Sequence, residues 1–86
     1  MLIRNQTKDA IYNLERALYL CIVPVSYYRE EDPECSINIK FTEGKKSIPI
    51  GTYPSHEYCK AILEIIYSNA TYDMFQMPEV IEDGST

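Results

Sequence analysis

The segment from Cys35 to Asn69 constrains the fold most, because a strand pattern, a turn, a second strand and an amphipathic helix follow without a gap. Apolar and polar residues alternate strictly over 35–41, which predicts a half-buried antiparallel strand with its odd-numbered side chains facing the core. After Ser55 the spacing of apolar residues changes from two to three and four, which predicts a helix that covers the sheet. The sequence therefore predicts a small α+β domain.

Three further segments have the composition of strands. Residues 2–5 and 11–14 are short apolar stretches on either side of a polar turn and are expected to form a hairpin. Residues 18–25 are apolar on both alternating sets, so they are expected to form a central strand covered on both faces. In the last strand, over 47–53, Pro49 requires an edge position or a bulge because it has no backbone N–H. The expected fold is α+β: an antiparallel meander sheet of about five strands with one C-terminal amphipathic helix packed across it.

The turn and helix signals within this pattern are specific. Gly44 supplies the positive φ that a hairpin between the strands at 35–41 and 47–53 needs. Ser55 is a good N-cap for the helix. Cys59 and Leu63 are expected at the margin of the buried stripe of the helix. The residues expected to form the stripe itself are Tyr58, Ala61, Ile62, Ile65 and Ile66.

At 86 residues the chain is expected to form one domain over 1–70, followed by a tail over 71–86 that is partly ordered or docks on a neighbour. A chain of this size buries only roughly 60–65% of the surface that its unfolded form exposes, so self-association is a simple way to gain stability. The tail carries large apolar residues that are expected to contact its own domain or another subunit. These candidate interface residues are Tyr72, Met74, Phe75 and Met77. A homo-oligomer is the expected state.

The net charge of −5 opposes non-specific binding to nucleic acid or to anionic lipid, so neither DNA nor a membrane is an expected partner. The predicted helix carries Lys60 as its one basic residue, which disfavours a regulator that inserts a basic helix into DNA. No basic residue follows Lys60, and the basic residues before it leave room for a local anion site.

Cys21, Cys35 and Cys59 are odd in number and widely spaced, which fits neither a disulfide framework nor a metal site, so reduced thiols are expected. Arg4 follows the first three residues at once, so no signal peptide is expected. The longest apolar run, residues 17–25, is too short to span a bilayer. These features predict a cytoplasmic protein.

The residues of an active site do not converge in this sequence. His56, the single histidine, is expected on the solvent side of the first helical turn, without a nucleophile or metal ligands at useful spacing. Gly44 and Gly51 are isolated, so a phosphate-binding loop is not indicated. The acidic residues at 30–34 lack the pattern of a calcium loop and are expected to be a solvated loop. The prediction is a protein that is not an enzyme and has neither cofactor nor metal.

The strongest compositional bias is eight tyrosines with no tryptophan. A tyrosine combines a flat apolar ring with a polar tip, which suits stacking on a base or forming a protein interface. Basic residues on rigid strands with an aromatic residue nearby would suit a small anionic ligand, although such residues are also typical of solvated strand ends. The candidate ligand-binding residues are Arg4, Arg16, Lys40, Lys45, Tyr27 and Tyr28.

Four short motifs give the chain a resemblance that covers nearly its full length: residues 2–6 (LIRNQ), 12–14 (YNL), 50–55 (IGTYPS) and 77–78 (MP). On these motifs the chain resembles a family of short uncharacterised proteins from phages, prophages and other mobile elements of Gram-positive bacteria. It differs from the usual pattern in the acidic insert at 29–34. The resemblance implies a viral or mobile-element origin, where small acidic proteins often bind and block a host component.

The expected function is therefore non-enzymatic binding that antagonises a host component such as a defence system. Two forms of this function remain open: blocking a host protein surface through the acidic loop and the tail, or sequestering a small anionic nucleotide signal between subunits. The alternative is a structural or regulatory accessory protein without a small-molecule ligand.

Overall fold

The computed structural model describes residues 1–25 and 33–80. In these residues the elements follow in the order β1 (Leu2–Arg4), β2 (Ile11–Asn13), the 3-10 helix η1 (Leu14–Arg16), β3 (Tyr19–Pro24), β4 (Cys35–Lys40), β5 (Ile48–Tyr53), α1 (His56–Ser68) and β6 (Met74–Gln76). Within them no helix is long and apolar enough to cross a membrane.

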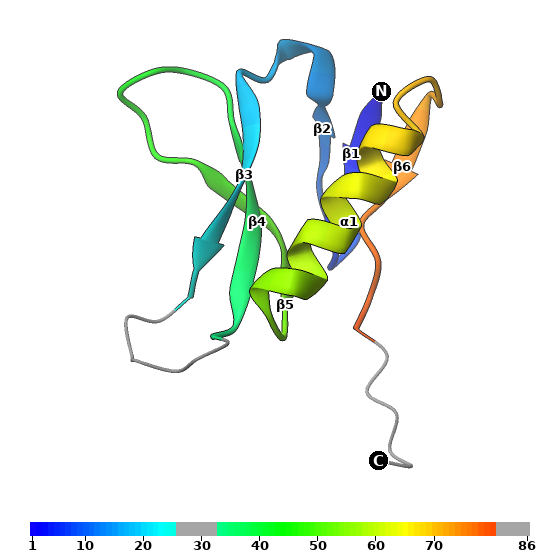
Figure 1. The fold of residues 1–86 in the computed structure, drawn as a ribbon. Helices are drawn as coiled ribbons and strands as arrows, with labels where there is room; N and C mark the ends of the chain where they lie inside the picture. Colours follow the sequence, from blue (N-terminus) through cyan, green and yellow to red (C-terminus); the bar gives the residue numbers. More distant parts are fainter. Residues whose placement is uncertain (26–32, 81–86) are drawn as a thin grey trace.

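The strands form two three-stranded sheets, with the orders β2-β1-β6 and β3-β4-β5, and α1 lies in front of both (Figure 1). The α+β class is confirmed, but the expected single meander of about five strands is wrong. The chain leaves β2 through η1, where the Asn13 side chain caps the turn by accepting the Glu15 N–H. Among the described strands, β2 therefore does not pair with β3, and the meander is limited to β3-β4-β5.

β6 occupies the second edge of β1, to which it runs parallel, with Ile3 opposite Phe75. The Leu2 N–H donates to the Asp73 carbonyl at 2.7 Å, and the Met77 N–H donates to the Arg4 carbonyl at 3.0 Å. Residues 74–77 thus dock on the first strand of their own chain. Since β6 follows α1, the helix is not the last element of the fold.

The expected central strand at 18–25 is also wrong, because β3 lies at an edge and β4 is the middle strand of its sheet. The buried positions of β4 include the polar residues Ser36 and Asn38, which are 7% and 8% exposed. Burial of these two side chains is tolerated because both are hydrogen-bonded. β5 is the other edge, and the register shift opposite residues 37–38 agrees with the edge or bulge predicted from Pro49.

The helix begins as predicted, with Ser55 Oγ accepting the Tyr58 N–H at 3.0 Å, and Gly44 has the expected positive φ of 82°. The buried face of α1 differs from the predicted stripe. The buried residues are Cys59, Ile62 and Ile66, while Ala61 is exposed and Tyr58 and Ile65 are 39% and 46% exposed. Compared with the prediction, α1 is therefore rotated about its axis. This rotation places Cys59 in the core and turns Tyr58 and Ile65 towards the surface.

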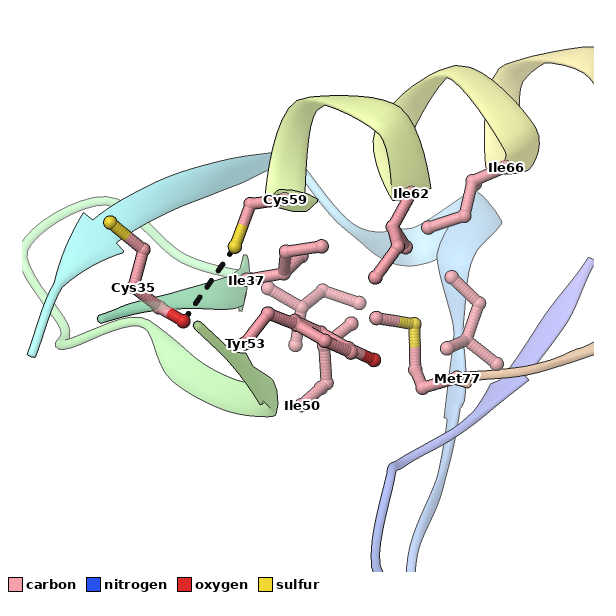
Figure 2. Close-up of a cluster of buried hydrophobic side chains, with 10 residues drawn as sticks. Cys35, Ile37, Ile50, Tyr53, Cys59, Ile62, Ile66 and Met77 are labelled. Carbon is pink, nitrogen blue, oxygen red and sulfur yellow. Dashed lines mark hydrogen bonds between the residues drawn. The ribbon is translucent and has the colours of Figure 1, made fainter. Parts of the chain in front are cut away.

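The core lies between α1 and the two sheets (Figure 2). Ile37 from β4 and Ile3 from β1 are both completely buried, so each sheet contributes to it. Met77 is also completely buried. The hydroxyl of Tyr53, a core residue that is 1% exposed, donates to the Pro78 carbonyl at 2.8 Å. One core thus joins the two sheets, the helix and the segment after β6.

Candidate binding surface

The β3-β4-β5 sheet has one face against α1 and one face turned away from it. Residues Cys35, Ile37 and Ile39 of β4 lie in the core, so strand alternation places the residues between them on the opposite face. We call this opposite face the outer face. It is formed by Tyr19, Cys21 and Val23 of β3, by Ser36, Asn38 and Lys40 of β4, and by Pro49 and Thr52 of β5.

A row of hydrogen-bonded polar side chains runs along the middle of the outer face. Ser36 Oγ donates to Asn38 Oδ1 at 2.6 Å, and Asn38 Nδ2 donates to Ser47 Oγ at 2.9 Å. Asn38 is 8% exposed, and both the oxygen and the nitrogen of its side-chain amide are hydrogen-bonded, so the amide is fixed in orientation. This row gives the outer face a rigid polar centre.

At one end of this row, Tyr19 lies directly opposite Lys40 in the antiparallel pairing of β3 and β4. The adjacent Leu18 N–H donates to the Lys40 carbonyl at 2.7 Å, which continues the pairing beyond the end of the strand. Tyr19 is 44% exposed. Side chains directly opposite on one face have Cβ atoms about 5 Å apart. The Tyr19 and Lys40 side chains therefore start from neighbouring positions on one face of the sheet.

The basic residues differ in whether a partner neutralises them. Lys8 and Lys60 form ion pairs with Glu79 and Glu57 at 3.2 and 3.7 Å, and the Arg4 guanidinium donates to the Gln76 side chain. Within the described part of the chain, Arg4 has this amide partner but no ion pair with a carboxylate, and four further cations also form no such ion pair: Arg16, Lys40, Lys45 and Lys46.

These four cations lie at the same end of the molecule. Arg16 ends η1, Lys40 ends β4, and Lys45 and Lys46 belong to the β4–β5 loop; η1 and this loop are both at the top of Figure 1. With Glu15 and Glu43, the segments 14–16 and 40–47 carry four positive and two negative charges, a net charge of +2. This basic end stands out in a chain whose net charge is −5.

The structure brings together only some of the ligand-binding candidates. Arg16, Lys40 and Lys45 share the basic end, whereas Arg4 lies on the other sheet, opposite Ile11 and Gln76. Tyr27 and Tyr28 fall outside the described residues.

The interface candidates are divided between surface and core. Tyr72 and Met74 are 62% and 51% exposed, Phe75 is partly buried against the core, and Met77 is fully buried in it. Met74 lies opposite Leu2, which is 40% exposed, on the face of the β2-β1-β6 sheet turned away from the core. Ile11, on the same face, is 55% exposed. These three side chains form a small apolar patch, which we call the Leu2 patch.

Sequence reasoning missed Tyr19, Asn38, Ser47 and Lys46 at the outer face and its basic end. The alternation at 35–41 already placed Asn38 on the same face as Lys40. The contribution of Tyr19 was not accessible, because the register of β3 against β4 cannot be read from one sequence.

The buried ionisable groups favour their neutral forms. Burial, with a smaller effect of Cys35, raises the pKa of the Cys59 thiol to about 11, so it is not a thiolate near neutral pH. Burial likewise raises the pKa of the Tyr53 hydroxyl above its usual value. Among residues 1–25 and 33–80, no group of three or more histidine, cysteine, aspartate or glutamate side chains is arranged to hold a metal ion.

Comparison with protein-family models, with curated proteins and with solved structures finds no match. The geometry of the site is thus the basis for assigning a function.

Proposed function

We propose that this chain is a non-enzymatic binding protein that holds a small anionic ligand with a planar ring, such as a nucleotide, at the basic end of the outer face. The observation that carries the proposal is the cross-strand pair of Tyr19 and Lys40, placed beside cations without carboxylate partners. The ring of Tyr19 offers a stacking surface, and the Lys40 ammonium offers a charge for phosphate.

The neighbouring groups support the same ligand chemistry. Lys45, Lys46 and Arg16 add positive charge from the adjoining loop and from η1. The Asn38–Ser47 pair supplies fixed polar groups next to Lys40. Because Tyr19 and Lys40 lie on paired strands, they need little reorganisation on binding, which limits its entropic cost.

The proposed biological role follows from the resemblance to proteins of phages and mobile elements. In this role the protein acts in the host cytoplasm and sequesters a nucleotide signal, thereby antagonising a defence system. It carries out no chemical step on the ligand, so one protein molecule removes a fixed number of ligand molecules.

A second candidate function is binding to a host protein surface, and the Leu2 patch favours it. Leu2, Ile11 and Met74 are exposed together on one sheet face, with Arg4 between Ile11 and Gln76. Apolar side chains around a basic residue are typical of protein interfaces. The Leu2 patch belongs to the β2-β1-β6 sheet, whereas Tyr19 and Lys40 belong to the β3-β4-β5 sheet. Substitutions in one sheet therefore test one candidate function without removing the residues of the other.

Calorimetric titration tests the nucleotide proposal. Adenine-containing cyclic nucleotides and inorganic pyrophosphate are titrated into the wild-type protein at low ionic strength. The proposal predicts measurable heat with at least one nucleotide and weaker binding of pyrophosphate, which has charge but no ring. It also predicts that added salt weakens binding, because the contact with phosphate is electrostatic.

Matched variants locate the site. Lys40→Ala and Tyr19→Ala are each expected to weaken nucleotide binding by about tenfold or more, the loss of roughly 1.4 kcal/mol or more. Lys60→Ala removes the same charge from α1 and is expected to leave binding unchanged. Absence of heat with every nucleotide rejects the proposal and favours the Leu2 patch, whereas equal losses in Lys40→Ala and Lys60→Ala reject the placement of the site.

A further inference from the structure

The two edges of the β3-β4-β5 sheet are treated differently by the chain. Gln6, in the β1–β2 loop, covers the β5 edge: its N–H donates to the Ile50 carbonyl at 2.8 Å. Its side-chain Oε1 accepts the Thr52 N–H at 2.9 Å, and its Nε2 donates to the Thr52 carbonyl at 3.1 Å. Pro49 and the register shift opposite residues 37–38 also make the strand at this edge irregular. The β5 edge is therefore protected by its own chain.

Among residues 1–25 and 33–80, the β3 edge has no covering side chain and no register shift, and its one proline, Pro24, is the last residue of the strand. Its backbone pairs with β4 alone in that part of the chain, in an unbroken register from Tyr19 to Pro24. No charged residue occurs from Ala17 to Val25. Leu18, Tyr19 and Val25 are 51%, 44% and 53% exposed. A regular, uncharged and apolar edge is a template for pairing with another strand.

We propose that β3 pairs antiparallel with β3 of a second copy of this chain. This pairing joins the β3-β4-β5 sheet of one copy to the β3-β4-β5 sheet of the other in one continuous sheet. The interface adjoins the proposed nucleotide site, because Tyr19 of β3 belongs to both. The pairing itself uses the backbone edge of β3, whereas the cations proposed to hold the ligand lie outside this strand, so loss of nucleotide binding and loss of the dimer can be measured separately. The dimer is closed, since each copy uses its single β3 edge.

Two-fold symmetry limits the possible registers of the β3–β3 pairing. A two-fold axis perpendicular to a continuous sheet places one residue opposite its own copy, and Cys21 and Ile22 are the residues nearest the middle of β3. Pro24 has no N–H to donate, so it is best placed outside the stretch in which the two β3 strands pair. With Cys21 at the centre, Pro24 faces Leu18 of the partner subunit, which lies before β3. With Ile22 at the centre, Pro24 faces Leu20 of the partner subunit, which lies within β3. The geometry therefore points to Cys21 on the axis.

The resulting side-chain pairs are complementary. On the core side, Leu20 lies opposite Ile22 of the partner subunit, and both side chains are only partly buried in the single chain. On the outer face, Tyr19 lies opposite Val23 of the partner subunit. Aromatic and β-branched residues make favourable cross-strand pairs. The pairing thus extends the core and leaves no charge at the seam.

A second copy suits this edge because of its charge. Two chains that each carry −5 repel one another, so they associate best through a segment free of charge. Residues 17–25 are such a segment, and a two-fold interface brings this segment against itself.

A charge-exchange experiment tests the interface. Cys21→Lys and Cys21→Glu each place like charges opposite one another on the axis, on a face where the side chain is half-buried and not part of the core. Sedimentation of each variant is expected to show at least about a tenfold weaker dimer than the wild type. An equimolar mixture is expected to restore the dimer as a heterodimer, which native mass spectrometry identifies. Tyr67→Lys, on an exposed residue of α1, is the matched control and is expected to remain dimeric.

Cross-linking gives an independent readout. Directly opposite residues in an antiparallel pair have Cα atoms about 4.5–5.5 Å apart, which suits a disulfide. Diamide, which accepts two electrons and two protons from two thiols, is expected to convert the wild type into a covalent dimer, and Cys21→Ser is expected to prevent this while the non-covalent dimer persists. A wild type that sediments as a monomer of 10.0 kDa overturns the proposal. So does a dimer that withstands both charge variants, or a mixture that stays monomeric while both variants remain folded.

Discussion

Two isoleucines of α1 offer the sharpest test of the fold, because sequence periodicity and the structure assign them differently. Periodicity places both Ile62 and Ile65 in the buried stripe, whereas the structure leaves them 3% and 46% exposed. The same substitution to alanine at each position removes the same three carbon atoms. The two variants should therefore differ widely in the free energy of unfolding.

The expected magnitudes follow from burial. At Ile62, the lost transfer free energy of three buried carbons is about 2.4 kcal/mol, and the cavity left between α1 and β4 adds to it, for a total of about 3–4 kcal/mol. At Ile65 about half of this transfer energy is lost, no enclosed cavity forms, and the higher helix propensity of alanine offsets part of the loss. We expect about 1 kcal/mol or less there.

Urea denaturation followed by circular dichroism measures both variants. The comparison is made at one protein concentration, because self-association makes stability depend on concentration. An unchanged m-value shows that the same surface unfolds. Equal losses at Ile62 and Ile65 refute the helix orientation that the structure gives, and a larger loss at Ile65 supports the stripe inferred from the sequence.

Two further perturbations probe the contacts that hold the sheets together. Gln6→Ala removes the side-chain hydrogen bonds to Thr52 and is expected to destabilise the protein by about 1–3 kcal/mol in the same urea assay; no change rejects the role of Gln6 at the β5 edge. Stability is expected to fall between about pH 9 and 11, because the unfolded chain releases the Cys59 proton near pH 9 while the folded state retains it up to its pKa of about 11. Burial of the Tyr53 hydroxyl extends the fall above pH 10. Cys59→Ala should flatten the profile from pH 9 to 11, and an equally steep profile in this variant rejects that assignment.

Local sequence signals predicted the elements whose residues determine their own conformation. The Ser55 cap, the positive φ of Gly44 and the irregular edge at Pro49 each follow from the chemistry of one residue, and the structure confirms them. The strict alternation at 35–41 likewise predicted the strand β4, but the expectation that this strand is half-buried is wrong, because Ser36 and Asn38 are buried as well. These signals are local, so a single sequence contains them.

Sheet order was not predictable in the same way, because it depends on pairings between distant segments. The apolar composition of 18–25 indicated a central strand, yet β3 is an edge, and the more polar β4 is central because Ser36 and Asn38 satisfy their hydrogen bonds within the sheet face. β6 has only three residues, too few to show a periodicity, and its pairing with β1 spans almost the whole chain.

The candidate binding surface shows the same division. The sequence identified Arg16, Lys40 and Lys45 as cations available to a ligand, and the structure places all three at one end. It did not separate them from Arg4, because only the two-sheet arrangement puts Arg4 on a different surface. It also did not identify Tyr19, whose position opposite Lys40 depends on the β3–β4 register.

The most direct test of the proposed function is an amide-resolved nuclear magnetic resonance titration with an adenine-containing cyclic nucleotide. We expect the largest shift changes at Tyr19, Asn38 and Lys40 and in the β4–β5 loop, with little change around Arg4 and Met74. Changes centred on the Leu2 patch, or a spectrum that no nucleotide alters, contradict the proposed function.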